Sequence, residues 1–324
     1  MRRGRRLIAS LFIAALVVPT TLVRTPVTRT VPEEIALTRI AGASATGVEG
    51  WQVEGVWQYS AGPTLAFGGY SALLTLGDTT LRAFSDRGFR LTFTAPDRAD
   101  ETPEKRRANR QWFAEEDKNR DFWDIESATR DPETGGYWLG YEYVHAIHRF
   151  TPASAEDGGR RLDGEEDWPI NSGLEALERL ADGRFLAIPE ASTEALIFPG
   201  DPVEGGEAVR LAFANPASGY AVTDAAELPD GRVLLLMRAL AWDFPPFGGL
   251  IAIAPAPPSQ ADAPWEAEIA LRFDAILPPE NYEGLAVREQ EDGKIAVWVI
   301  SDDNLSALQR TLLVMLTFDP DQSR

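Results

Sequence analysis

Acidic side chains recur at the start of short apolar segments along this sequence. Glu126, Glu175, Asp224 and Glu283 take this position, and Ser71 takes it in an earlier segment. Carboxylates gathered at one place raise each other's pKa unless a cation or an arginine lies among them. Calcium suits such a set, because it takes about six to eight oxygen ligands and needs neither thiolate nor imidazole. The residue types therefore indicate a calcium site at the four acids, provided that the fold brings them together.

A second set of charged residues lies at the end of the apolar stretch that follows each of these segments. Acids at such positions also occur as solvated turn residues, or as acceptors of backbone N–H bonds. This alternative stays open for each residue taken singly. The second set comprises Asp86, Glu142, Glu190, Arg238 and Asp302, with Arg87 and Asp303 as its neighbours.

The elements that must position these residues are β-hairpins. The two apolar stretches of a segment are joined by turns such as Asp182-Gly183, Asp230-Gly231 and Asp292-Gly293, whose residues tolerate a positive φ. The segments repeat at roughly 50 residues, which is typical of propeller blades with inserted loops. In a propeller the first strand of each blade lines the channel, so equivalent residues of successive blades form a ring.

The count of blades follows from the β-rich stretches. Five segments carry the repeat, and the alternating stretch from Trp51 to Phe67 predicts one more, so we expect an all-β, six-bladed β-propeller. Strands at Ile35–Ile40 and Thr311–Phe318 would pair within one blade and close the ring. Three polar or Pro-rich stretches predict surface connections: Asp97–Arg120, Pro152–Trp168 and Pro255–Pro264.

Charge and the first residues indicate where the protein acts. The net charge of -19 disfavours binding to nucleic acid or to an anionic membrane surface. Arginines at positions 2, 3, 5 and 6 precede an apolar run, Leu7–Val18, that is too short for an ordinary membrane-spanning helix. We therefore expect a signal peptide or N-terminal anchor at residues 1–30, one propeller domain at residues 31–324, no further integral membrane domain, and a periplasmic or secreted location.

Several blocks of the sequence also carry a family resemblance. They are Gly68–Leu73 with Phe84–Gly88, Asn171–Leu177, Leu228–Arg232, and Asn281–Ala286 with Ser301–Asn304. In this order they resemble the signature blocks of the bacterial phytase-like (esterase-like activity of phytase) family, over Gly68 to Phe318. The sequence departs from the family pattern at Met237, where a glutamate is expected before Arg238, and at Ala176, where a glycine is expected.

The resemblance implies a propeller exported to the periplasm, with an acidic active site related to that of calcium-dependent propeller phytases. Carried over to this sequence, the site residues are Glu126, Glu175, Glu283, Asp86, Asp302 and Asp303. Bound calcium would bridge these carboxylates and a small-molecule phosphate ester. Glu175 and Glu283 would be ligands, and Glu126 a ligand or general base. Arg87 or Arg238 would clamp the developing negative charge.

Whether the protein is an enzyme stays open at this level. The alternative is a non-catalytic binding or assembly module of the cell envelope, in which the ring of acids is a structural ion site. Hydrolysis of carboxylic esters is a weaker alternative, because the sequence has no cysteine and Ser71 does not lie in a Gly-x-Ser-x-Gly motif.

Overall fold

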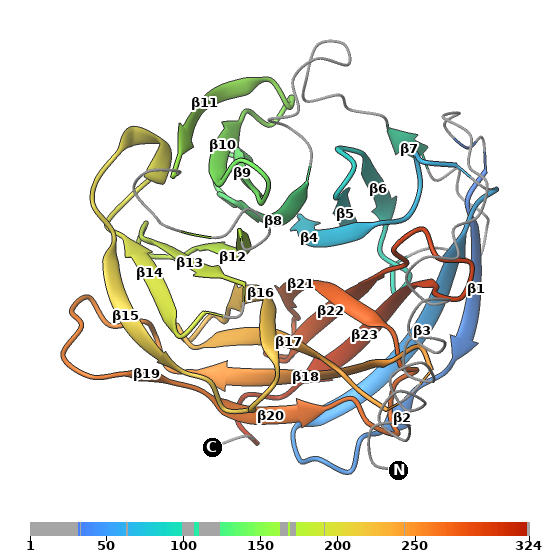
Figure 1. Cartoon of the computed structure of the whole chain (residues 1–324). Coiled ribbons are helices and arrows are strands. Elements are labelled where there is room, and N and C mark those ends of the chain that lie inside the picture. Colours follow the sequence, from blue (N-terminus) through green and yellow to red (C-terminus); the bar gives the residue numbers. More distant parts are fainter. Residues whose placement is uncertain are drawn as a thin grey trace, which may run out of the picture.

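The computed structural model describes residue 32 and residues 34–62, 64–98, 107–109, 124–162, 168, 173–190, 192–242 and 244–322. These residues form an all-β propeller whose five blades surround one channel (Figure 1). Residues 1–30, where the sequence predicts a signal or anchor, lie outside the described residues. Among the described residues, no helix has the length and hydropathy that crossing a bilayer requires.

Blades 1 and 2 are antiparallel sheets whose strands follow the order of the chain. Blade 1 comprises β4 (Tyr70–Leu76), β5 (Thr80–Ser85), β6 (Arg90–Thr94) and β7 (Arg107–Asn109). Blade 2 comprises β8 (Ile125–Arg130), β9 (Tyr137–Tyr141), β10 (Ala146–Phe150) and β11 (Glu156–Arg161).

Blades 3 and 4 are joined at their outer edges by one short strand. Blade 3 comprises β12 (Leu174–Arg179), β13 (Phe185–Pro189), β14 (Glu194–Phe198) and β15 (Val209–Ala214), with the short helix η2 (Pro202–Glu204) between the last two. Blade 4 comprises β16 (Ala221–Glu227), β17 (Val233–Leu240), β18 (Phe247–Ala254) and β20 (Glu268–Arg272). The connection from β18 to β20 contributes β19 (Trp265–Glu266), which pairs in parallel with β15 of blade 3.

Blade 5 closes the ring with strands from both ends of the described chain. It comprises β21 (Asn281–Glu289), β22 (Ile295–Asp302), β23 (Thr311–Phe318), β3 (Trp51–Ser60) and β1 (Ala36–Ala41), with β2 (Ser44–Ala45) paired to β3. β3 lies between β23 and β1, so that Thr311 faces Tyr59 and Phe318 faces Trp51. In Figure 1 the blue β1 and β3 run beside the red β22 and β23.

The prediction of six blades is wrong. The stretch from Trp51 to Phe67 contains one long strand, β3, which completes blade 5 instead of forming a blade of its own. The first and last strands do lie in one blade, as expected, but β3 separates them. Two stretches predicted as surface connections also carry outer strands: β7 lies within Asp97–Arg120, and β11 lies within Pro152–Trp168.

The hydrophobic core lies between successive blades. Aromatic pairs span three of these boundaries, with ring centroids 5.1 Å apart for Tyr59–Phe93, 5.6 Å for Phe84–Tyr137 and 4.9 Å for Trp138–Phe185. Such pairs stabilise a fold beyond the area that they bury. They hold the blades together, and the innermost strands β4, β8, β12, β16 and β21 therefore meet around the channel (Figure 1).

Candidate functional site

A β-bulge shapes the start of every innermost strand. The strand register shifts by one residue between Tyr70 and Ala72, and the same shift recurs in β8, β12, β16 and β21. A bulge leaves one residue outside the ladder and re-aims its side chain. The five bulge residues are Ser71, Glu126, Glu175, Thr223 and Glu283.

The sequence repeat is therefore shifted by one residue in blade 4. Thr223, and not Asp224, is the bulge residue of β16. Asp224 lies at the position that Ala72 and Ala176 occupy in β4 and β12, and its side chain is only 1% exposed. It accepts hydrogen bonds from the backbone N–H groups of Ala225 and Leu285. The structure thus separates Asp224 from the other acids of the predicted calcium site.

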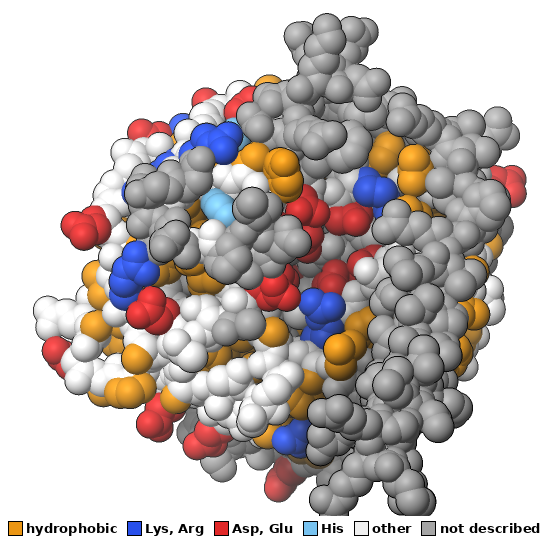
Figure 2. Space-filling view, in the orientation of Figure 1, with side chains coloured by type: hydrophobic (Ala, Val, Ile, Leu, Met, Phe, Trp, Pro, Cys, Tyr) orange, Lys and Arg blue, Asp and Glu red, His pale blue; other side chains and the backbone are white. Residues whose placement is uncertain are grey.

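One cavity of about 460 Å³ lies at the mouth of the channel where the innermost strands begin. The bulge residues of the other four strands line it: Ser71, Glu126, Glu175 and Glu283. Residues of the second set line the same cavity, so the structure brings the two sets together. Figure 2 shows acidic side chains gathered at the middle of this face. The lining residues of this acidic cavity are Ser71, Asp86, Asp124, Glu126, Glu142, Glu175, Glu190, Arg238, Glu283, Asp302 and Asn304.

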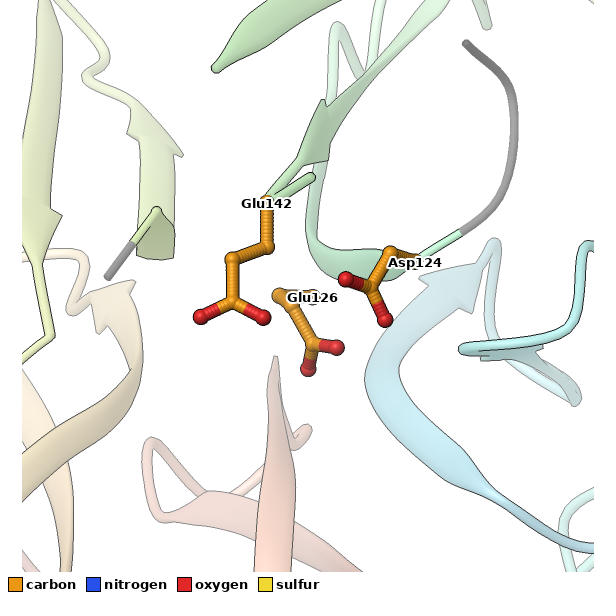
Figure 3. Close-up of side chains that lie close together, drawn as sticks. All are labelled: Asp124, Glu126 and Glu142. Carbon is orange, nitrogen blue, oxygen red and sulfur yellow. The ribbon is translucent and has the colours of Figure 1, made fainter. Parts of the chain in front are cut away.

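Within the acidic cavity, the carboxylates form two overlapping groups. Asp124, Glu126 and Glu142 each place an oxygen so that the three atoms lie within 4.8 Å of one another. Figure 3 shows these three side chains converging from blade 2. Glu142 also belongs to a second group with Glu175 and Glu190, within the same distance. Glu142 therefore joins acids from blades 2 and 3.

Burial and mutual repulsion raise the pKa values of these carboxyls. Burial is the larger cause for Glu126 and for Glu175, and the charge of Glu283 adds to it at both residues. Burial and then the Asp124 charge raise the pKa of Glu142 to about 7. Burial also raises the pKa of Asp302, with further increases from Glu283 and Asp86. This set of acids is not stable as a fully charged cluster unless positive charge compensates it.

Arg238 supplies positive charge on one side of the cavity. Its Nη1 lies 3.3 Å from Glu283 Oε1 and donates a hydrogen bond of 2.9 Å to Asn281 Oδ1. Asn281 Nδ2 donates to the same Glu283 oxygen at 2.7 Å. Burial raises the pKa of Glu283, and Arg238 and Asn281 act against that rise. Among the described lining residues Arg238 is the only base, so most of the acids have no cationic partner there.

Two predicted site residues lie behind the cavity wall. Arg87 Nε lies 3.6 Å from Asp86 Oδ1 but does not line the cavity. Burial raises the pKa of Asp86 to about 6, and Arg87 limits that rise. Asp303 accepts hydrogen bonds from the backbone N–H of Gly69 at 3.1 Å and from the Thr311 hydroxyl at 3.0 Å. Arg87 and Asp303 therefore contact residues near the cavity and do not face into it.

Gly69 makes this arrangement possible. Its φ is +67°, and a Cβ at this position would collide with the side chains of Asp86 and Arg87. A left-handed φ and a close approach both favour glycine. The Gly-Gly pair of the sequence motif thus leaves room for a carboxylate of the cavity.

Asp124 is a cavity residue that sequence reasoning missed as a site residue. It precedes β8 with a φ of 72°, and its backbone N–H donates to Asp86 O. The sequence places Glu142 and Glu190 in the second set, without a role in the expected site. Asp124 stands two residues before Glu126, a spacing that would signal two acids on one side of a strand.

These features define a closed β-propeller with a carboxylate-lined cavity at one mouth of its channel. The sequence matches the family described as "Phytase-like: Esterase-like activity of phytase" over residues 65–305, and the chain belongs to this family. No curated protein matches the chain.

Two solved structures that the chain matches share little sequence with it. One is described as "YCF48 bound to D1 peptide", with 15% identity, a TM-score of 0.40, and coverage of 86% of this chain and 77% of that chain. Another is a protein of unknown function from Bacteroides caccae, with 9% identity, a TM-score of 0.35, and coverage of 79% and 69%.

Proposed function

We propose that the acidic cavity is the active site of an exported, calcium-dependent phosphoester hydrolase. The observation that carries the proposal is the convergence of Asp124, Glu126 and Glu142, whose oxygens lie within 4.8 Å of one another. Membership of the phytase-like family supports the same chemistry. The arginine-led apolar run at residues 1–30 supports export to the periplasm or beyond the cell.

The donor set fits calcium. Calcium–oxygen bonds are about 2.3–2.6 Å long, so two oxygens on one ion lie no more than about 5 Å apart. Both carboxylate groups meet this limit, and Glu142 belongs to each of them. The donors are hard oxygens, which calcium prefers over nitrogen or sulfur. Asp124, Glu126 and Glu142 would hold one ion, and Glu142, Glu175 and Glu190 a second.

The substrate in this proposal is a small phosphate ester. Bound calcium would polarise a phosphoryl oxygen and lower the pKa of an attacking water. Arg238 lies beside Glu283 at the wall of the cavity, where its guanidinium can bind a phosphate oxygen. Where Asp124 and Glu142 suffice to hold the first ion, Glu126 would take the proton from water. Arg87 would act indirectly, by holding Asp86 in place.

A structural ion site is the second candidate, and contacts between blades favour it. Glu142 of blade 2 accepts a long hydrogen bond of 3.4 Å from the backbone N–H of Gly173, at the start of blade 3. Glu175 of blade 3 lies in a carboxylate group with Glu142. An ion held by both residues would link two blades, whether or not the protein catalyses a reaction.

Phosphate release distinguishes the two candidates. The purified protein would be stripped with chelator, titrated with calcium, and assayed on phytate and on a simple aryl phosphate. We expect saturable, calcium-dependent release that Glu175→Gln reduces by at least tenfold, because a ligand charge is lost. Glu291→Gln, at an exposed turn residue, is the matched control and should behave as wild type. Calcium that raises the melting temperature without any phosphate release would support the structural site instead.

A further inference from the structure

The opposite mouth of the channel has a different chemistry. β8 and β12 end there at Arg130 and Arg179, which occupy the last positions of their strands. A cavity of about 210 Å³ lies between the strand ends, several times the roughly 30 Å³ of a water molecule in the liquid. Its polar lining residues are Thr75, Thr129, Arg130, Glu178, Arg179 and Glu227. We call it the arginine cavity.

Neither arginine has a close ion pair within the part of the chain that the structure describes. Burial lowers the pKa of Arg130, and only the more distant charges of Asp131 and Glu178 oppose that effect. Arg179 Nη2 lies 3.9 Å from Asp131 Oδ2, at the limit of an ion pair. Asp131 is instead held by the Glu133 backbone N–H and the Thr134 hydroxyl, each at 2.9 Å. Both guanidinium groups therefore have N–H donors that remain available to another acceptor.

The acids of the arginine cavity are bound to other groups. Glu178 accepts hydrogen bonds from the Thr129 hydroxyl at 2.8 Å and from the Glu227 backbone N–H at 2.9 Å. Glu227 in turn accepts one from the backbone N–H of Ala181 at 2.5 Å. Burial raises the pKa of Glu178 to about 7, which reduces its negative charge near neutral pH. These bonds link blades 2, 3 and 4, and neither Glu178 nor Glu227 forms a hydrogen bond or a close ion pair with Arg130 or Arg179 in the part of the chain that the structure describes.

We propose that the arginine cavity binds a small tetrahedral oxyanion, such as phosphate or sulfate, between Arg130 and Arg179. Guanidinium groups donate in a fixed fork that matches oxyanions. Donors from two strands can reach more than the two oxygens of a carboxylate, which favours a tetrahedral ion. Apolar side chains of Leu73, Leu285 and Val287 line the same cavity, and a less polar surrounding strengthens the attraction. The arginine cavity and the acidic cavity share no lining residue, so this site does not depend on the proposed hydrolase.

Sulfate is a suitable probe, because it stays a dianion across the neutral range and is not a product of the proposed reaction. Titration calorimetry at constant ionic strength on the full chain should show saturable binding that phosphate displaces. Arg130→Gln should weaken sulfate binding by at least about tenfold, the scale of one charge-assisted hydrogen bond. Arg232→Gln is the control, since Arg232 lies in the β16–β17 turn and pairs with Asp230 at 2.6 Å. It should bind sulfate as wild type does.

A second test of the proposal looks for a variant that binds sulfate more tightly. Glu178→Gln removes a negative charge from the cavity and should tighten sulfate binding, while Glu175→Gln in the acidic cavity should leave it unchanged. A sulfate affinity equal in wild type and Arg130→Gln, with both folded by circular dichroism, would overturn the proposal. So would the lack of saturable binding by wild type at millimolar sulfate. Acetate that displaces sulfate at equal concentration would overturn the tetrahedral assignment.

Discussion

The backbone N–H of Leu285 in β21 donates a hydrogen bond of 2.6 Å to the carboxylate of Asp224 in β16. Asp224 also accepts a bond from the Ala225 backbone N–H at 2.8 Å, and its side chain is almost completely buried. A buried carboxylate needs such partners, because its desolvation is costly without them. Asp224 therefore ties blade 4 to blade 5, away from the acids that line the channel mouth.

Asp224→Asn should destabilise the protein without changing its calcium affinity. The amide keeps one acceptor oxygen but turns an NH2 group toward the second N–H donor. We expect a loss of about 1–3 kcal/mol in the free energy of unfolding, the cost of a buried donor left unsatisfied. Urea unfolding measures the loss, and calorimetry measures calcium binding. A tenfold fall in calcium affinity would contradict this prediction and show that Asp224 contributes to calcium binding.

Stability of the calcium-free protein should depend on pH in the opposite sense to that of an ordinary acidic protein. The pKa of Glu142 is about 7 against an ordinary value of 4.5, and that of Asp86 is about 6 against 3.8. The folded state thus binds protons more tightly than the unfolded state, and its stability falls as pH rises through this range.

We expect the melting temperature in chelator to decrease from pH 5 to pH 8, and saturating calcium to remove most of that decrease. Calcium binds the deprotonated carboxylates and so favours the folded state at high pH. Glu142→Gln should flatten the profile in chelator. A melting temperature that rises over this pH interval in chelator would contradict the raised pKa values.

Gly69→Ala should cost more stability than Gly77→Ala in the same blade. Both glycines have a left-handed φ, +67° and +66°, which costs an alanine about 1–2 kcal/mol. A Cβ at Gly77 meets nothing within 4 Å, whereas one at Gly69 collides with Asp86 and Arg87. Calcium affinity should fall only in Gly69→Ala. Equal unfolding free energies for the two variants would show that the Asp86 side chain adapts without cost.

Deletion of residues after Leu308 should abolish cooperative folding. The deletion removes β23, which pairs with β22 on one side and with β3 on the other. Without it the ring is open, and two sheet edges and the apolar surface beneath β23 are exposed. Far-ultraviolet circular dichroism should show no cooperative thermal transition. Deletion of residues 321–324, beyond β23, is the control and should melt like the full chain. A native melt of the longer deletion would contradict closure by β23.

The repeat of hairpins and acids could be predicted from the sequence, because strand alternation and Asp-Gly turns are local signals. Asp182, Asp230 and Asp292 each accept a hydrogen bond from the backbone N–H two residues later, as expected for such turns. The family resemblance was readable for the same reason, since its blocks coincide with these hairpins.

The number of blades and the position of Asp224 outside the acidic cavity could not be predicted from the sequence. Whether β3 forms its own blade or completes blade 5 depends on pairing with β23, more than 250 residues away along the chain. The alignment of Asp224 with Glu175 fails because the bulge residue of β16 is Thr223, which is therefore the residue equivalent to Glu175 in β12. A bulge changes which side chain faces the channel by one residue, and no local pattern marks it.

The sequence by itself determined an all-β propeller, its family, and the acids available for a site, because these follow from short-range patterns and from sequence blocks that resemble those of the family. Only the tertiary structure decided that Asp124, Glu142 and Glu190 join Glu126 and Glu175 in one cavity, while Arg87 and Asp303 lie behind its wall. It also revealed the arginine cavity at the other mouth. The physical reason is that a closed ring brings together residues about 50 positions apart, and their relative directions depend on bulges and on packing between blades.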